Sequence, residues 1–483
     1  MTAILELENH LGGRWSAGEG PDFTSTSPHD PDQVVAAGRS ASTAQVDAAL
    51  RSASARRRSW RRTPIHERAT HLLRAADILD GEAAGWAPTM ARESGKPVGE
   101  CRGELARAAQ ILRYHAHQAD APAGTQFASP RAGERILVDH RPLGVVAVIS
   151  PFNFPIAIPA WKIAPALVYG NTVVWKPPTS VAATADLLMR ALEASGLPAG
   201  VLSLVHGDAE VGDHLVGAPE VDAVTFTGST PVGTAIAARC AARGVPVQAE
   251  MGGKNAAVVL ADADLDAAVA AVVSGAFRSA GQKCTATSRL VLHTAIADDF
   301  LERLTAAMAG VTVGDPEDES TYVGPLISAS ARDRVDAATS RAVEHGARLI
   351  CRMSVPEGVR GHHCAPTVLE IASCDAELWQ EELFGPVLAV LRTDQIDVAL
   401  EAAASGPFAL SLAVFGSDLG DVLDAIDEAG AGMVHINSET AGADPHVPFG
   451  GNGLSSFGPR EQGASARDFY TTATTVYLQA VKR

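Results

Sequence analysis

Apolar residues recur at helical spacing in the first part of the chain. Between residue 42 and about residue 115, they return every three or four positions, as in "STAQVDAALRSASAR" and "IHERATHLLRAADILDGEAAGWAPTMARESGK". This spacing places apolar side chains on one face of a helix. Ser42 and Thr43 open the first stretch, and both are residue types that cap a helix N-terminus well. The pattern predicts amphipathic helices over this region.

The rhythm changes from Arg141 onward, where short apolar runs alternate with helical stretches. The runs are "PLGVVAVISPFNFP", "NTVVWKPP", "VLSLVHG", "AVTFTG" and "PVQAEMGGKNAAVVL", and helical stretches such as "SVAATADLLMRALEASG" and "STPVGTAIAARCAARG" lie between them. Strands and helices at this spacing predict βαβ units on a parallel sheet. Such sheets bind ligands at the carboxyl ends of their strands, so the polar residues that follow each run are the candidates for function.

A second α/β block extends from about Asp262 to about Gly453, with the runs "RLVLH", "GARLI", "SLAVFG" and "GMVHIN". Two further β-like runs, "ERILVDHRP" (residues 134–142) and "TTATTVYLQAVK" near the C-terminus, have no evident partner within a domain. Strands of this kind often pair across subunits. We therefore expect them to take part in oligomerisation.

Composition excludes several classes of protein. A chain of 483 residues has room for two or three domains, and its net charge of −17 argues against nucleic-acid binding, which needs a basic face. The basic stretch from Arg51 to Arg62 has helical spacing and is expected to be a solvated helix face. No apolar run reaches the ~18 residues of a membrane span. We expect neither nucleic acid nor membrane as a partner.

Six cysteines are too few for a disulfide framework in a chain of this length. The N-terminus shows no signal peptide, so a reducing cytoplasm is the expected compartment. The cluster "HHC" (residues 362–364) with Cys374 does not have the spacing of a zinc site, and we interpret these residues as part of a surface loop. No metal is predicted.

Cys284 lies in the polar stretch "FRSAGQKCTATSR", between basic residues. Most cysteines behave as small buried hydrophobes, and Cys240 in "IAARCAARG" fits that description. A nucleophilic thiolate instead needs exposure and nearby positive charge, which Lys283 and Arg278 are expected to supply. Thr285 and the other small neighbours leave room for a substrate. The sequence therefore favours Cys284 as a nucleophile.

Seven short stretches, taken together, resemble the signatures of the NAD(P)-dependent aldehyde dehydrogenase superfamily. In order they are "PFNFP", "WKPPT", "FTGST", "EMGGKN", "GQKCTATSR", "EELFGPV" and "PFGG". The resemblance implies an α/β fold with a Rossmann-type cofactor domain, an α/β catalytic domain and a small β oligomerisation element. In this chain the cofactor domain would comprise residues 1–123 and 143–251, and the catalytic domain residues 252–453. The oligomerisation element would comprise the strands within 124–142 and 466–483. The resemblance also implies a homodimer or homotetramer.

The resemblance implies a thioester mechanism for the oxidation of an aldehyde to an acid. Cys284 would add to the aldehyde, Asn153 and the Cys284 backbone N–H would hold the oxyanion, and Glu250 would activate the hydrolytic water. Two alternatives remain open, namely a CoA-acylating aldehyde dehydrogenase and a catalytically silent relative. CoA-acylating relatives lack a glutamate at the position of Glu250. A silent relative would tolerate the loss of Cys284, Asn153 or Glu250, and all three are present.

The cofactor stretches lack a G-x-G-x-x-G fingerprint in its usual place, and the family does not use one. The resemblance implies that the nicotinamide cofactor is bound by Ile149, Lys176, Thr179, Gly228, Ser229, Gly233, Glu382 and Phe384. Strict NAD users often carry a glutamate three residues after the lysine, where this chain has Thr179. A carboxylate there would repel a 2′-phosphate, so we expect NADP to be accepted, with NAD also open.

Arg278 gives the first indication of the substrate. It stands six residues before Cys284, where semialdehyde dehydrogenases carry an arginine that binds the substrate carboxylate. Their second arginine corresponds to Trp161 here. The substrate site is completed by Phe154, Thr285 and Phe449. We expect a short aldehyde with an anionic tail, first a dicarboxylic semialdehyde and second a phosphonate-bearing aldehyde. The alternative for Arg278 is an ion pair with a local carboxylate.

Overall fold

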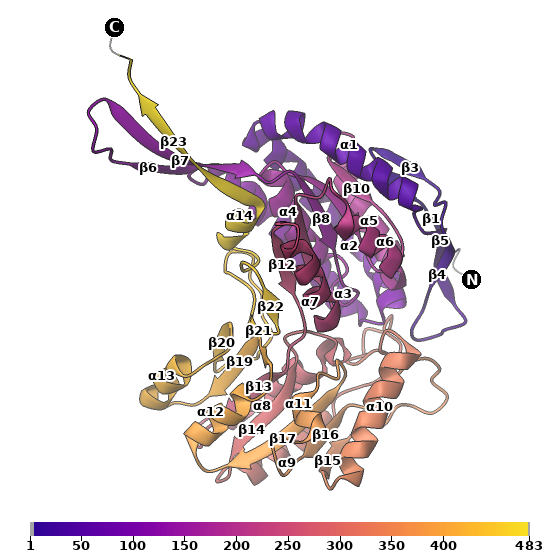
Figure 1. Cartoon of the computed structure of the whole chain (residues 1–483). Helices are drawn as coiled ribbons and strands as arrows, with labels where there is room; N and C mark the ends of the chain where they lie inside the picture. Colours follow the sequence, from indigo (N-terminus) through magenta and orange to yellow (C-terminus); the bar gives the residue numbers. More distant parts are fainter. Residues whose placement is uncertain (1–3, 482–483) are drawn as a thin grey trace.

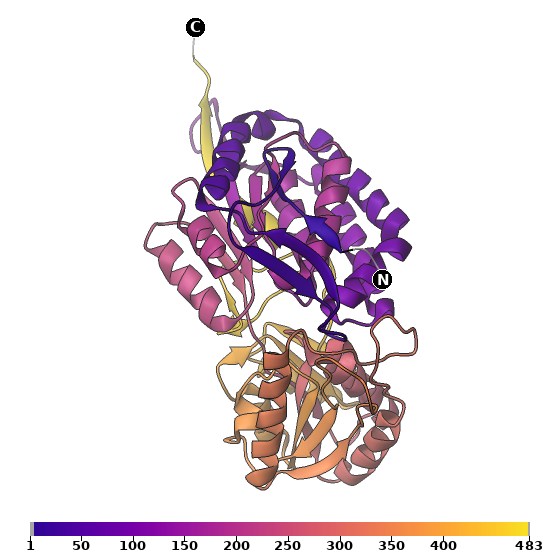
Figure 2. The ribbon, with the colours of Figure 1, turned by 90° about the vertical axis from the view of Figure 1, so that its right-hand side faces the viewer.

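The computed structural model describes residues 4–481 and shows two α/β lobes with a projecting β arm (Figure 1). Figure 2 shows the lobes one above the other, the N-terminal half of the chain in one and residues from about 255 to 436 in the other. The predicted α/β architecture, with a Rossmann-type sheet, a second α/β sheet and a small β element, is confirmed.

The first lobe is built on an eight-stranded sheet whose central five strands are parallel. In spatial order the strands are β22 (Ser456–Phe457), β12 (Val247–Glu250), β11 (Ala223–Thr227), β8 (Val145–Ile149), β9 (Thr172–Lys176), β10 (Leu202–Leu204), β2 (Asn9–Leu11) and β3 (Arg14–Ser16). Alternate residues of β8 enter different cores: Val146 and Val148 pack in one, Val145 and Ala147 in the other. Fully buried parallel strands are accordingly apolar on both faces.

Helices cover both faces of this sheet. They are α1 (Thr43–Arg62), α2 (Ile65–Ser94), α3 (Val98–His117), α4 (Ala157–Val168), α5 (Ala182–Ala194), α6 (Ala209–Gly217) and α7 (Thr230–Ala241). Ser42 caps α1 as expected: its side chain accepts from the Gln45 N–H, and the Gln45 side chain accepts from the Ser42 N–H in return. Most arginines of the Arg51–Arg62 stretch are exposed, which confirms a solvated helix face.

The second lobe carries a seven-stranded sheet that is parallel except at β15. Its order is β15 (Arg348–Arg352), β16 (Thr367–Glu370), β17 (Val387–Thr393), β14 (Thr287–His293), β13 (Asn255–Val259), β19 (Ser411–Phe415) and β20 (Met433–Ile436). The helices are α8 (Leu265–Phe277), α9 (Ala297–Met308), α10 (Ala329–Glu344), α11 (Glu377–Gln380), α12 (Ile396–Ala404) and α13 (Leu419–Asp427).

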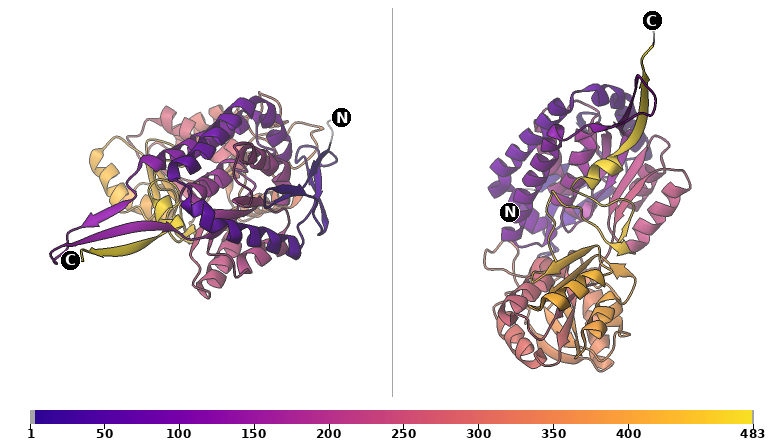
Figure 3. Two further views of the ribbon diagram at one scale, coloured as in Figure 1. Left: turned by 90° about the horizontal axis from the view of Figure 1, so that it is seen from above. Right: turned by 90° about the vertical axis from the view of Figure 1, so that its left-hand side faces the viewer.

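The arm is a three-stranded antiparallel sheet that projects from the first lobe (Figure 3). It contains β6 (Gly124–Phe127), β7 (Glu134–Pro142) and β23 (Thr471–Gln479), which follows α14 (Ser465–Tyr470). The two β-like runs without an evident partner thus pair with each other, from Pro142 opposite Thr471 to Glu134 opposite Gln479. The outer edges of β6 and β23 carry exposed apolar residues, among them Phe127 and Tyr477.

Two small sheets complete the described secondary structure: β1 (Leu5–Leu7), β5 (Val34–Arg39) and β4 (Asp22–Thr26) form one, and β18 (Phe408–Ala409) with β21 (Asn452–Gly453) the other. Within residues 4–481, no helix combines the length and apolar content needed to cross a bilayer.

The interpretation of residues 362–364 as a surface loop is wrong for His363 and Cys364, which are buried. The N-terminal segment packs over them: the His362 N–H donates to the Pro28 carbonyl, and His363 Nε2 lies 3.0 Å from His29 Nδ1. A contact between segments more than 300 residues apart leaves no local signal. Among the described residues, no group of three or more His, Cys, Asp or Glu side chains is arranged to hold a metal ion.

Candidate active site

A cavity of about 610 Å³ has Cys284 in its wall. It is also lined by all five residues that were predicted to bind substrate, namely Phe154, Trp161, Arg278, Thr285 and Phe449. These side chains come from three distant parts of the sequence. Trp161 and Phe449 pack against each other, with their ring centroids 5.3 Å apart. The fold therefore brings the predicted nucleophile and the predicted substrate residues to one place.

Cys284 lies on a turn between the 3₁₀ helix η3 (Arg278–Gly281) and β14. The turn is held from the second lobe, because Asn255 Nδ2 donates to the Cys284 carbonyl at 2.8 Å and to the Ala286 carbonyl at 2.9 Å. Thr440 Oγ1 donates to the Thr285 carbonyl at 2.7 Å. Within residues 4–481, no carbonyl accepts the Cys284 backbone N–H. That N–H is therefore available to an oxyanion.

The expectation that Lys283 and Arg278 favour the thiolate is wrong for this structure. Burial raises the pKa of the Cys284 thiol to about 12, and the carboxylates of Glu250 and Glu382 raise it further. Lys283, which also lines the cavity, donates from Nζ to the Ser274 carbonyl at 3.4 Å. A thiol with a raised pKa must lose its proton before it can attack.

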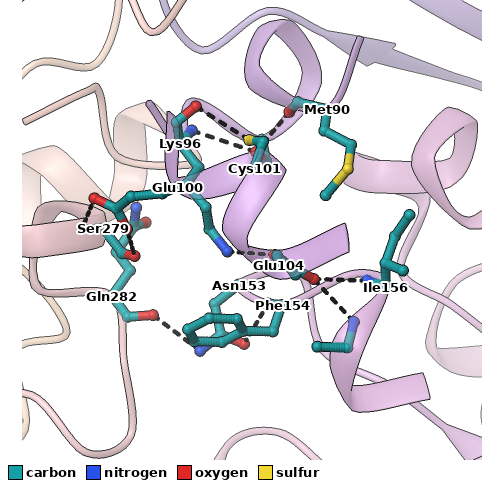
Figure 4. Close-up of polar contacts among 12 residues, drawn as sticks. Met90, Lys96, Glu100, Cys101, Glu104, Asn153, Phe154, Ile156, Ser279 and Gln282 are labelled. Carbon is teal, nitrogen blue, oxygen red and sulfur yellow. Dashed lines mark hydrogen bonds and ion pairs between the residues drawn. The ribbon is translucent and has the colours of Figure 1, made fainter. Parts of the chain in front are cut away.

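Asn153 follows the carboxyl end of β8 and is buried. Its Nδ2 donates to the Gln282 carbonyl at 2.9 Å, and its Oδ1 accepts from the Phe154 N–H at 3.1 Å (Figure 4). The amide donor therefore points at the backbone two residues before Cys284. An amide N–H and a free backbone N–H beside a thiol can together hold an oxyanion that forms at that sulfur.

Glu250 ends β12 and is buried. Its Oε2 accepts from Ser456 Oγ at 2.6 Å, and its Oε1 packs against Gly450, where a Cβ would lie only 2.7 Å from that oxygen. Burial raises the pKa of Glu250 well above its usual range, and the nearby Glu461 adds to the effect. Glu461 is in turn paired with the buried Lys162. A carboxylate whose pKa is raised is a stronger base than a free carboxylate, which suits it to take a proton from water.

The predicted cofactor residues fall in two groups at the carboxyl ends of the parallel strands. Ile149 pairs with Lys176 across β8 and β9, and Thr179 begins the short 3₁₀ helix η2 (Thr179–Val181) just beyond. A Cβ on Gly212 would lie 3.4 Å from Lys176 Cδ, so α6 closes tightly over this side chain. Burial lowers the pKa of Lys176 to about 8.

The second group surrounds the N-terminus of α7. Ser229 occupies the cap position without a side-chain cap hydrogen bond, so the first N–H groups of α7 stay free for a ligand. A Cβ on Gly233 would collide with Met251 Sδ at 2.5 Å. A helix N-terminus with free N–H groups fits a pyrophosphate, so the residues present fit a dinucleotide.

Glu382 and Phe384 approach the same place from the second lobe. Glu382 Oε1 accepts from the Gly253 N–H at 2.8 Å, and burial raises the pKa of this carboxyl to about 7. Phe384 has a φ of +56°, a left-handed conformation that costs a bulky residue energy and that clusters at functional sites. Its ring stands edge-on to Phe152 at 5.9 Å.

Arg278 is exposed on the cavity wall. Its guanidinium lies 5.8 Å from the Tyr322 ring centroid, and within residues 4–481 it forms no close ion pair, although Tyr322 and the carboxylates of Glu100 and Glu439 raise its pKa against the effect of burial. A second arginine lines the cavity from α3: Arg107 pairs with Asp444 at 3.0 Å. Asp444 is thus partly neutralised by a cation that sequence reasoning missed.

Sequence reasoning also missed the contribution of α3 to the cavity. The cavity is lined by Glu100, Glu104 and Arg107 of α3 and by Lys96, which precedes the helix. The stretch "KPVGECRGELAR" carried a signal, because the three residues of α3 recur at i, i+4 and i+7 and so share one helix face. Asn255, which follows Lys254 in "EMGGKN", likewise escaped notice as the residue that fixes the Cys284 turn.

Comparisons with known proteins agree with this architecture. Residues 15–476 match the Aldehyde dehydrogenase family, and the chain therefore belongs to that family of oxidoreductases. It is 40% identical over 487 residues to the α-ketoglutaric semialdehyde dehydrogenase of Bacillus subtilis (strain 168), with 99% of this chain and 100% of the relative covered. It is 37% identical over 476 residues to the α-ketoglutarate semialdehyde dehydrogenase of Haloferax volcanii, with 97% and 98% covered. A solved NAD-dependent aldehyde dehydrogenase from Sinorhizobium meliloti superposes with a TM-score of 0.95 at 32% identity, with 98% of this chain and 95% of that one covered.

Proposed function

We propose that this enzyme oxidises a short aldehyde with an anionic tail to the carboxylic acid through a thioester on Cys284. The observation that carries the proposal is the Cys284 thiol in a cavity wall, with the Asn153 amide directed at the same turn. The Cys284 sulfur, once deprotonated, adds to the aldehyde carbon. The Asn153 amide and the Cys284 N–H stabilise the oxygen that becomes negative.

Lys176, Glu382, Phe384 and the N-terminus of α7 would hold the nicotinamide cofactor, which when bound would supply the acceptor for the hydride that leaves the adduct. Glu250 then takes a proton from water, and the resulting hydroxide attacks the thioester carbon. The acid leaves and the Cys284 sulfur is regenerated, so each turnover consumes one water and releases one acid.

Glu250 supports this hydrolytic route over transfer of the acyl group to coenzyme A, because a thiol acceptor needs no base for water. A steady-state rate that does not depend on added coenzyme A separates the two. A catalytically silent relative would bind NADP without ever reducing it. Measurement of NADP binding and NADP reduction on the same preparation distinguishes that case.

The anionic tail is supported by Arg278, which lines the cavity without an ion-pair partner within residues 4–481. The semialdehydes named for the Bacillus and Haloferax relatives carry a carboxylate at the end opposite the aldehyde, which fits this arginine. We propose a dicarboxylic semialdehyde, of which α-ketoglutaric semialdehyde is the first to assay, and a phosphonate-bearing aldehyde as the second class.

Arg278→Leu is expected to lower kcat/KM for α-ketoglutaric semialdehyde by about ten- to a hundredfold. This is the effect of losing one charge-assisted hydrogen-bonded contact between the guanidinium and the substrate carboxylate. Propanal should be oxidised as well as before or better. Initial rates on both aldehydes give the answer, with Arg278→Lys as the variant that keeps the charge and loses the bidentate geometry. An equal loss on both aldehydes would make Arg278 a structural residue.

We propose that NADP is accepted beside NAD, because Thr179 leaves room for a 2′-phosphate near Lys176. Thr179→Glu should lower the NADP/NAD ratio of kcat/KM at least about fivefold, since a carboxylate near the phosphate costs ~1 kcal/mol or more even in water. Thr179→Gln is the control of equal size without the charge. A ratio that stays constant in the glutamate variant would show that Thr179 does not face the ribose.

We also propose the division of labour between the parts of the chain. Residues 1–123 and 143–251 would bind the cofactor, residues 252–453 would carry the nucleophile, and the strands within 124–142 and 466–483 would join subunits in a homodimer or homotetramer. The projecting arm with its open edges supports this assignment. Light scattering on the native chain and on a variant with Tyr477→Asp would test it.

A further inference from the structure

Helix α3 presents two carboxylates to the two segments that form the candidate active site (Figure 4). Glu100 and Glu104 stand one turn apart on the cavity face of α3. We propose that they are positioning residues, which together hold the Asn153 loop and the Cys284 turn in register. This inference rests on the proposed function, since it assigns a role toward Asn153 and Cys284.

Glu104 holds the Asn153 side. Its Oε1 accepts from the Ile156 N–H at 2.8 Å and from the Ala157 N–H at 3.0 Å. These are the first N–H groups of α4, and Ile156 at its cap position has no side chain able to accept them. Glu104 therefore replaces the missing cap from another helix, and its negative charge suits the positive end of α4. The loop of Asn153 leads directly into this anchored turn.

The Glu104 charge is compensated in place. Its Oε2 pairs with Lys96 Nζ at 2.5 Å, and both side chains are buried. Lys96 Nζ also lies 3.8 Å from the centroid of the Phe154 ring, the residue next to Asn153. A buried ion pair with further contacts of this kind tolerates little movement, because loss of one partner leaves a charge uncompensated. The Asn153 loop is thus held by Glu104 of α3 and by Lys96, which precedes that helix.

Glu100 holds the Cys284 side. Its Oε1 accepts from the Ser279 N–H at 3.0 Å, and its Oε2 accepts from Ser279 Oγ. Ser279 and Ala280 have φ values of +54° and +52°, the left-handed region that residues with a Cβ rarely adopt. Such strain persists only where neighbouring groups hold it. Glu100 makes two hydrogen bonds to the strained turn that sets the path of the chain to Cys284.

The two anchored segments meet where the oxyanion would form. Asn153 Nδ2 donates to the Gln282 carbonyl at 2.9 Å, so the loop that Glu104 holds touches the turn that Glu100 holds. The separation between the Asn153 amide and the Cys284 sulfur is therefore set by one rigid helix face.

The test compares Glu100→Ala, Glu100→Gln, Glu104→Ala and Glu104→Gln with Arg113→Gln. Arg113 lies on the same helix but pairs with Asp77 and Asp80 at the surface, away from the cavity. The readouts are the single-turnover rate of NADPH formation, the Kd for NADP and the thermal midpoint. We expect both alanine variants to form NADPH about 30- to 100-fold more slowly, because a shift of about 1 Å between the Asn153 amide and the Cys284 sulfur has an effect of this size. The Kd for NADP should stay within twofold of the native value.

Glu100→Gln keeps an oxygen that can accept the Ser279 N–H, so it should recover most of the rate lost in Glu100→Ala. Arg113→Gln should match the native enzyme. The proposal would be overturned if the alanine variants stay within threefold of the native rate. It would also be overturned if Glu100→Gln is as slow as Glu100→Ala, or if the Kd for NADP rises as much as the rate falls. If Glu104→Ala does not fold, the Glu100 pair and Glu104→Gln still decide. Native enzyme that reduces neither NADP nor NAD would instead refute the proposed function.

Discussion

Replacement of Cys284 by alanine is expected to lower kcat by at least about a thousandfold, the loss that follows removal of a covalent nucleophile. The residues assigned to the cofactor lie elsewhere, on β8, β9, the N-terminus of α7 and the loop of Glu382, so NADP binding should persist. Turnover is measured as NADPH formation with α-ketoglutaric semialdehyde, and binding as the quenching of tryptophan fluorescence by NADP.

Cys374→Ala is the matched control, since Cys374 is also half-buried and also lies in the second lobe. It should retain native kcat. Retention of more than a few per cent of native activity by Cys284→Ala would show that the thiol is not the nucleophile. Loss of NADP binding in the same variant would show that Cys284 shapes the cofactor site instead.

Glu250→Gln should separate the two halves of the reaction. The first turnover should still release a burst of NADPH, because thioester formation precedes the step that needs activated water. The steady-state rate should then fall about a hundredfold or more, as expected for removal of a general base. Stopped-flow absorbance of NADPH at a known concentration of enzyme gives the burst amplitude and the later slope in one trace.

The pH profile provides an independent check on Glu250. Its pKa is raised by burial, and only the ionised carboxylate can accept a proton from water. The native steady-state rate should therefore fall as the pH drops through that raised pKa, and the residual rate of Glu250→Gln should lack this dependence. Equal losses of burst and steady state in the variant would assign Glu250 to thioester formation or to structure.

The sequence predicted the strands and their polar ends well, for a physical reason. Short apolar runs that alternate with amphipathic helices have few alternatives to a parallel sheet, and the carboxyl ends of such strands meet at one edge. The family resemblance supplied Ile149, Lys176 and Glu250, and the structure places all three at that edge. The start of α1 could also be predicted from the sequence, because the hydrogen bonds between Ser42 and Gln45 that cap the helix lie within one turn.

The contacts that the sequence did not reveal all join distant segments. Basic residues stand close to Cys284 in the sequence. The pKa of its thiol is nevertheless raised by burial and by two carboxylates from other strands and loops. His363 and Cys364 are covered by the N-terminal segment near Pro28. The role of α3 depends on where a helix packs, and helical periodicity shows only which residues share a face. Such features need the tertiary structure.

The most direct test of the account is the capture of the thioester. Glu250→Gln, mixed with NADP and α-ketoglutaric semialdehyde and quenched in acid after the burst, should carry one acyl group per active site. Peptide mass spectrometry should place it on the peptide that contains Cys284, with the mass of the dicarboxylic acyl group. NADPH formation equal to the burst with no adduct on that peptide, or an adduct on any other cysteine, would contradict the account.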